Sequence, residues 1–197
     1  MNIVTPKIEL IASTTLTNTV EGGPKIEDWM SLNPDATDAE SLVEHAGRGC
    51  YESWHRPNKA TAKTSDYINR TAFEMQHGSI LEHASATFRF SGVSRAWLVE
   101  MSRHRHLSWS VASQRYVDAN TFGVVIPPAI RGATGSIVYD SEATYDDLEG
   151  PASEALEWWA RDAMWHYETL AEHLQDNGLP RKQAREAARS VLPNCTE

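Results

Sequence analysis

The sequence predicts a water-soluble protein of mixed α and β structure with one domain over residues 1–197. Of the 197 residues, 41% are hydrophobic and 23% are charged, so the chain can bury a core without extensive disorder. Two segments alternate apolar and polar side chains with the period of a strand, and a longer one repeats apolar side chains with the period of a helix. No apolar run approaches the roughly 18 residues of a membrane span. The N-terminus shows no secretory signal, and we therefore expect a cytoplasmic protein.

Three strands are expected in the first two thirds of the chain. Residues 3–12 and 84–91 place apolar side chains at alternate positions, which is typical of strands, and the second strand is expected to be half-buried. A short apolar run at 124–126 is stopped by two prolines. Gly92 follows the second strand and ends it.

Two helices are expected between the first two strands. A Thr-x-x-Glu capping box at Thr37 begins the first, which places Cys50 on its apolar side as a core thiol. The second covers about 65–77, with Gly78 at the position of a C-terminal cap. Its apolar positions are Ile68, Ala72 and Met75.

Three more helices are expected after the second strand. Ser94 caps the first of them, which carries Trp97, Leu98 and Met101. Gly150-Pro151 begins a long amphipathic helix, and the residues 177–180 end it and start the last helix. The apolar positions of the long helix are spaced by four and three residues: Leu156, Ala160, Ala163, Tyr167, Leu170 and Leu174.

Charge is distributed unevenly along the sequence. The net charge of −9 argues against a general basic surface for nucleic acid. Basic residues nevertheless gather in 89–115, above all in its part 103–115, and in 181–189, whereas 134–177 is strongly acidic. Compact basic segments in an acidic protein indicate a pocket for a small anion. The two cysteines, Cys50 and Cys195, have no spacing typical of a disulfide framework or a metal site.

The basic segment 103–115 combines three arginines with hydroxyl, amide and aromatic side chains. Arginine presents a rigid fork that matches phosphate, and flat rings can stack on a base. The segment therefore predicts a phosphate or nucleotide site. Arg181, Arg185 and Arg189 are spaced by four and are expected on one helix face. Glu100 and His104 have the same spacing and could pair if the helix extends that far.

The order of residues in this segment resembles the signature of the flavin-dependent thymidylate synthases. Arg103, His104 and Arg105 are followed by seven residues and then Ser113. Further blocks that fit the family lie in the same order along most of the chain: His77–His83, Gly92–Arg95, Gln114–Tyr116 and Arg181–Asn194. Several ordered blocks are a far more specific signal than Arg-His-Arg alone.

The resemblance implies an α+β fold with a small, mainly antiparallel sheet flanked by long helices. It also implies the reductive methylation of dUMP to dTMP, with 5,10-methylenetetrahydrofolate as carbon donor and NADPH-reduced FAD as hydride carrier. The family works as a homotetramer whose active sites lie between subunits. The expected partner is therefore dUMP together with further copies of the chain, with no nucleic acid, no membrane and no metal.

Site residues follow from the resemblance, position by position. Positions that contact FAD are Ser79, Arg103, His104, Arg105 and Val111, and those that contact dUMP are Glu100, Arg103, Ala112, Ser113, Gln114, Arg115 and Arg189. No catalytic residue is assigned, although Ser113 is a candidate nucleophile if a base lies beside it. Val111 departs from the glutamate or glutamine of relatives, and one lost hydrogen bond would weaken binding about 5- to 150-fold.

Alternatives to a complete enzyme remain open. Relatives continue beyond Asn194–Glu197 with a segment that adds FAD contacts and an arginine for the uracil ring, so we expect this chain alone to be a poor catalyst. A separate C-terminal fragment could supply that segment, or the chain could be a structural or regulatory subunit of a tetramer. A metal hydrolase is the third alternative. Its ligands would come from His77, Glu82, His83, His104 and His106.

Overall fold

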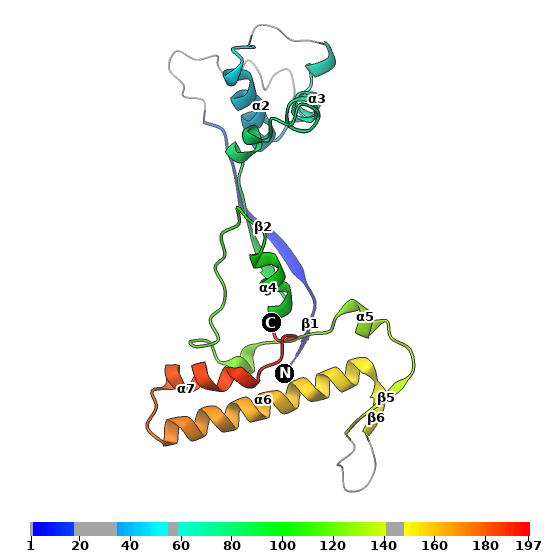
Figure 1. The fold of residues 1–197 in the computed structure, drawn as a ribbon, viewed down its shortest axis with the longest axis vertical. Coiled ribbons are helices and arrows are strands. Elements are labelled where there is room, and N and C mark those ends of the chain that lie inside the picture. Colours follow the sequence, from blue (N-terminus) through cyan, green and yellow to red (C-terminus); the bar gives the residue numbers. More distant parts are fainter. Residues whose placement is uncertain (1, 18–34, 55–58, 141–147) are drawn as a thin grey trace. The chain divides into compact units, whose positions relative to one another are not determined.

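The structure is a computed structural model that describes residues 2–17, 35–54, 59–140 and 148–197. Contacts divide the chain into two compact units. Residues 9–89 form what we call the N-terminal unit, and residues 1–8 with 90–197 form the C-terminal unit (Figure 1). The interpretation of 1–197 as one domain stays a prediction. Among the described residues, no helix has both the length and the apolar character that crossing a membrane requires.

The β structure of the described residues consists of three two-stranded sheets. Strand β1 (Ile3–Val4) pairs in parallel with β4 (Val124–Val125), and β2 (Lys7–Ser13) pairs with β3 (Ala86–Ser91). The third sheet joins β5 (Ser136–Asp140) and β6 (Leu148–Pro151) in antiparallel register. The mixed α+β class is confirmed.

Two strand predictions need correction. The strand expected over 3–12 is interrupted at Thr5 and Pro6, because proline has no amide hydrogen for a sheet. Half-burial of the strand over 84–91 was wrong for most of its length: Phe88 is 49% exposed, whereas Phe90 is half-buried. Alternation predicts a strand, but whether anything covers it depends on the rest of the fold.

The N-terminal unit is built from α2 (Asp38–Cys50), η1 (Lys59–Thr61), α3 (Thr64–Ile68), η2 (Asn69–Glu74) and η3 (Gly78–His83). The predicted capping box is confirmed: the Thr37 hydroxyl accepts from the Glu40 amide at 3.3 Å, and the Glu40 carboxylate accepts from the Thr37 amide at 2.8 Å. These two bonds also lower the pKa of Glu40. Val43, Ala72 and Ile80 form the core of the unit.

The second predicted helix differs from expectation. After α3 the backbone continues as a π-helix, η2, and ends at Glu74. Gln76, with φ of 60°, takes the left-handed conformation that was expected at Gly78. The wider π-helical turns move the buried face, so that Met75 is 47% exposed. Cys50 is also exposed, because it is the last residue of α2; the prediction of a core thiol was wrong.

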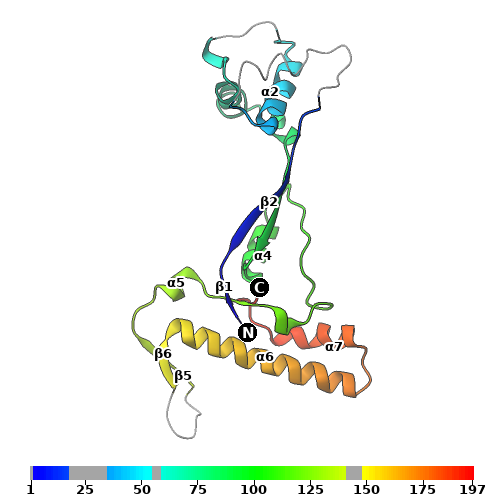
Figure 2. The ribbon, with the colours of Figure 1, turned by 180° about the vertical axis from the view of Figure 1, so that it is seen from behind.

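The C-terminal unit is mainly helical. It contains α4 (Arg95–Ser102), η4 (Ala119–Thr121), α5 (Pro128–Arg131), α6 (Ala152–Asp176), α7 (Arg181–Ala188) and η5 (Arg189–Val191). Helix α7 folds back along the end of α6, as Figures 1 and 2 show. The core lies where these helices meet η4: Ala119, Phe122, Met164, Tyr167, Ala171 and Ala188.

The predicted apolar stripe of α6 is right in part. Ala160 and Tyr167 are buried as expected. Met164 and Ala171 are also buried, whereas Leu170 is 39% exposed. Met164 and Ala171 therefore take the places expected for Ala163 and Leu170, whereas Ala160 and Tyr167 keep theirs, since a period of 3.6 residues allows either of two adjacent positions to face the core and packing selects between them.

Gly92 sits at a position that only glycine fits. Its φ is +64°, and a Cβ atom there would lie 2.1 Å from the carbonyl oxygen of Thr5. We expect Gly92→Ala to lower the free energy of unfolding by about 2–3 kcal/mol, because a backbone atom cannot yield easily. The control is Gly178→Ala, where φ is +89° but the space is open; it should cost only about 1 kcal/mol. Equal losses in urea titrations would show that the clash with Thr5 does not matter.

Candidate functional site

The basic segment 103–115 runs back along α4 in the direction opposite to the helix. It leaves the helix end at Arg103, the C-cap residue. The Trp109 ring then packs edge-on against Trp97, with centroids 5.8 Å apart. Further on, Nη2 of Arg95 donates to the carbonyl oxygen of Ala112 at 2.9 Å. The two ends of the segment therefore lie at opposite ends of α4, which is eight residues and so about 12 Å long.

The turn after α4 is exposed and rich in cationic groups. His106 adopts a left-handed backbone with φ of 65°. Across the parts of the chain that the structure describes, the side chains of Arg103, His104 and Arg105 make no hydrogen bond or ion pair. Glu100 and His104 do not pair there either, because α4 ends at Ser102. The side-chain donors of Arg103, His104 and Arg105 are therefore exposed to solvent and free to bind a ligand.

The residues 113–118 form a tight turn at the other end of α4. The amides of Tyr116 and Val117 both donate to the carbonyl oxygen of Ser113, at 3.1 and 2.9 Å. The Ser113 hydroxyl accepts from the amide of Arg115 at 3.4 Å. Since no carboxylate or imidazole in the described residues bonds this hydroxyl, Ser113 has no visible base and stays only a candidate nucleophile.

Helix α7 contacts this turn through several charged side chains. Arg185 donates to the carbonyl oxygen of Tyr116 at 2.9 Å and to the carboxylate of Asp118. Arg115 lies 3.4 Å from the carboxylate of Glu186. Lys182 lies 4.8 Å from the centroid of the Tyr116 ring, and it lowers the pKa of that phenol first by hydrogen bonding and then through its charge. The two basic segments of the sequence thus meet.

Arg95 is a further candidate for the site that the sequence pattern did not single out. Burial lowers its pKa most, and the charge of Arg189 lowers it further, whereas Glu197 acts in the opposite direction. Its Nε atom is buried and lacks a hydrogen-bond partner in the described residues. Two arginines whose charges oppose each other, one of them part-buried and incompletely bonded, form a cationic site suited to an anion. The clustering of arginines between 89 and 115 was the available signal.

The three arginines spaced by four do not act as one face. Arg185 contacts the 116–118 segment, whereas Arg189 follows the end of α7 at Ala188 and lies near Arg95. Ser79 lies in η3 of the N-terminal unit and is exposed. Val111 is 46% exposed, and Gln114 is half-buried. The structure therefore brings Ala112–Arg115 together with Arg189, and it keeps Arg103–Arg105 at the opposite end of α4.

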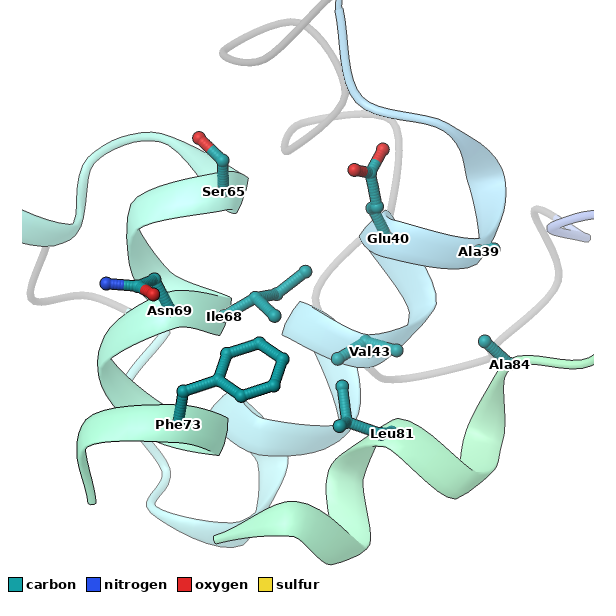
Figure 3. A pocket seen from close by; sticks show the side chains of 9 residues that line it. All are labelled: Ala39, Glu40, Val43, Ser65, Ile68, Asn69, Phe73, Leu81 and Ala84. Carbon is teal, nitrogen blue, oxygen red and sulfur yellow. The ribbon is translucent and has the colours of Figure 1, made fainter. Parts of the chain in front are cut away.

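The N-terminal unit contains an apolar cavity of about 390 Å³ between α2, α3 and η3. Figure 3 shows Ile68 and Phe73 pointing toward Val43 and Leu81 across it. None of the predicted site residues lines it. Glu40 at its rim is already bonded within the capping box.

The alternative metal site is not assembled in the described residues. No group of three or more histidine, cysteine, aspartate or glutamate side chains among them is placed to hold a metal ion. Cys195 packs against the apolar cluster around Val124, and burial raises the pKa of its thiol. A protonated, half-buried thiol is a poor nucleophile and a poor ligand.

These features define an α+β protein with a cluster of arginines that suits an anionic ligand. A sequence model of the family described as thymidylate synthase complementing protein matches residues 33–197. The chain is 43% identical over 190 residues to the probable flavin-dependent thymidylate synthase of Mycobacterium phage D29, covering 96% of this chain and 74% of that protein. It is 41% identical over 195 residues to the flavin-dependent thymidylate synthase of Mycobacteroides abscessus, covering 99% and 71%. The chain belongs to the flavin-dependent thymidylate synthase family.

Solved structures with a similar fold include a UMP/dUMP methylase, PolB, from Streptomyces cacaoi. Its complex with 5-Br dUMP matches 98% of this chain and 70% of that chain, with a TM-score of 0.58 and 22% sequence identity. The complex with 5-Br UMP gives a TM-score of 0.54. At this identity the likeness supports the fold and nothing further.

Proposed function

We propose that this chain binds dUMP and FAD and takes part in the reductive methylation of dUMP to dTMP, in the cytoplasm. The names of its relatives support the reaction and the flavin. NADPH and 5,10-methylenetetrahydrofolate are the co-substrates that the family implies. When bound, FAD supplies the hydride that completes the new methyl group.

The pair of arginines at the start of α4 and the end of α7 carries the proposal. The charge of Arg189 lowers the pKa of Arg95, and the charge of Glu197 acts in the opposite direction. A phosphate dianion would relieve this repulsion and accept bonds from both guanidinium groups. Arg115 is available as well, because its ion pair with Glu186 is long and about 40% exposed, and such pairs contribute little stability.

The exposed turn at the far end of α4 supports flavin binding. Arg103, His104 and Arg105 offer charged and polar donors of the kind that a dinucleotide pyrophosphate requires. These donors fit FAD by their chemistry. Because they are separated from the Arg95–Arg189 pair by the length of α4, we propose that another copy of the chain brings the flavin and the nucleotide together. A homotetramer would supply that copy.

The test begins with the purified chain and two ligands. We expect the protein to retain flavin absorbance through gel filtration and to bind dUMP in calorimetric titrations. Deoxyuridine is the matched control because it lacks only the phosphate, and it should bind about 100-fold more weakly than dUMP. Equal binding of the two would overturn the proposed phosphate site.

Turnover is measured separately as tritium release from labelled dUMP with NADPH and the folate. Turnover together with selective dUMP binding supports the full reaction. Selective dUMP binding without turnover would instead support the alternative of a structural subunit, or of one completed by a separate C-terminal fragment. Adding that fragment from a relative should then restore tritium release in the second case only.

A further inference from the structure

We propose that Arg185 is a positioning residue that fixes the nucleotide-binding turn 113–118 against α7. The inference rests on the proposed function, since it concerns how the residues Ser113–Arg115 are held for dUMP. Arg185 lies within α7, and its guanidinium donates hydrogen bonds to the protein itself, at Tyr116 and Asp118. It therefore acts on the turn and not on the ligand.

The guanidinium group of Arg185 bridges two points of the turn. Nη1 donates to the carbonyl oxygen of Tyr116 at 2.9 Å, and Nη2 donates to Oδ2 of Asp118. The side chain is only 13% exposed. The Asp118 side chain is 40% exposed. Because both bonds have a charged donor, they belong to the stronger kind of hydrogen bond.

The Asp118 end of this bridge is anchored in the core. The other oxygen of the same carboxylate, Oδ1, accepts from the amide of Asn120 at 3.1 Å and so caps η4. Within η4, Ala119 is fully buried in the cluster that includes Tyr167 and Ala188. Arg185 therefore connects the turn to a fixed point of the fold.

The other end of the bridge bonds a residue that closes the turn. The Tyr116 and Val117 amides close the turn on the Ser113 carbonyl, and Arg185 holds the carbonyl of the same Tyr116. The other described α7 side chains that contact the turn are more exposed: Glu186, which pairs with Arg115, is 43% exposed, and Lys182 beside the Tyr116 ring is exposed as well. Arg185 is thus the least exposed of these three side chains, and it bonds the backbone of the turn.

The experiment compares Arg185→Met and Arg185→Lys with the control Arg161→Met. Arg161 lies on α6 in an exposed ion pair with Glu157, away from the turn. Hydrogen exchange of the full chain, without ligand, reports the Tyr116 and Val117 amides, and calorimetry reports the Kd for dUMP. In Arg185→Met we expect both exchange and Kd to rise about tenfold or more. Arg185→Lys, which keeps the charge without the fork, should fall between, and Arg161→Met should match the wild type.

Each outcome distinguishes this role from others. Unchanged exchange in Arg185→Met overturns the proposal, whatever happens to dUMP binding. Weaker dUMP binding with unchanged exchange would mean that Arg185 contacts the nucleotide directly. If the wild-type chain does not bind dUMP, the proposed function fails, and the exchange of the turn alone decides whether Arg185 positions it. If Arg185→Met does not fold, Asp118→Asn replaces it with the same expected results.

Discussion

Replacing Arg95 with methionine is expected to weaken dUMP binding about 100-fold, which equals a loss of about 2.7 kcal/mol. The guanidinium of Arg95 is part-buried, its Nε atom lacks a partner in the described residues, and Arg189 adds a second positive charge nearby. A nucleotide phosphate would gain from all three features. Removing the side chain removes a strong donor and half of the local charge.

The same substitution should leave stability almost unchanged. Loss of the bond to Ala112 and of the contact with the Phe122 ring, 5.5 Å from the guanidinium, costs stability. Relief of the repulsion by Arg189 and of the desolvation of Arg95 offsets that cost. We therefore expect the free energy of unfolding to change by less than about 1 kcal/mol.

The matched control is Arg131→Met. Arg131 also donates to a backbone carbonyl, that of Ile126, at 3.4 Å, but it belongs to α5 and not to the site. Calorimetry should give the wild-type Kd for this variant. A large loss of stability in Arg95→Met with unchanged dUMP affinity would assign Arg95 to the fold and remove it from the binding site.

Local signals in the sequence predicted local structure well. Thr37 and Glu40 form their capping box, and the Ser94 hydroxyl accepts from the amide of Trp97 at 3.1 Å. Each depends only on residues three positions apart. The π-helix at 69–74 and the end of α2 at Cys50, which leaves that side chain exposed, carry no comparable local signal.

The basic segments of the candidate site could be identified from the sequence, but their arrangement in space could not. The basic segments 103–115 and 181–189 do meet, through Arg185 and Arg115. Arg103–Arg105 and Ala112–Arg115 nevertheless lie at opposite ends of α4. This separation depends on the length of that helix and on the reversal of the chain after it. Arg95 was missed because its significance comes from Arg189, which is distant in the sequence and near only in the fold.

The largest expected effect on stability is at the buried ion pair of Glu44 and Arg48. Their side chains are 3% and 4% exposed, and Arg48 Nε lies 2.7 Å from Glu44 Oε1. Arg48 also donates to the carbonyl of Thr61 at 3.2 Å and lies 4.4 Å from the centroid of the Tyr67 ring. Glu44→Gln removes the buried carboxylate charge that this guanidinium bonds, so the N-terminal unit should lose about 3–5 kcal/mol of unfolding free energy.

The loss is measured by unfolding the protein in urea, with hydrogen exchange of peptides from α2 as the readout. These peptides report on the unit that contains the pair. The control is Glu157→Gln on α6, which breaks an ion pair of the same four-residue spacing at an exposed position and should cost less than about 1 kcal/mol. The double variant Glu44→Gln, Arg48→Met removes both charges and should be more stable than Glu44→Gln alone. If the two substitutions instead lower the stability additively, burial of the pair contributes no interaction energy, and the core of the N-terminal unit depends on its apolar contacts alone.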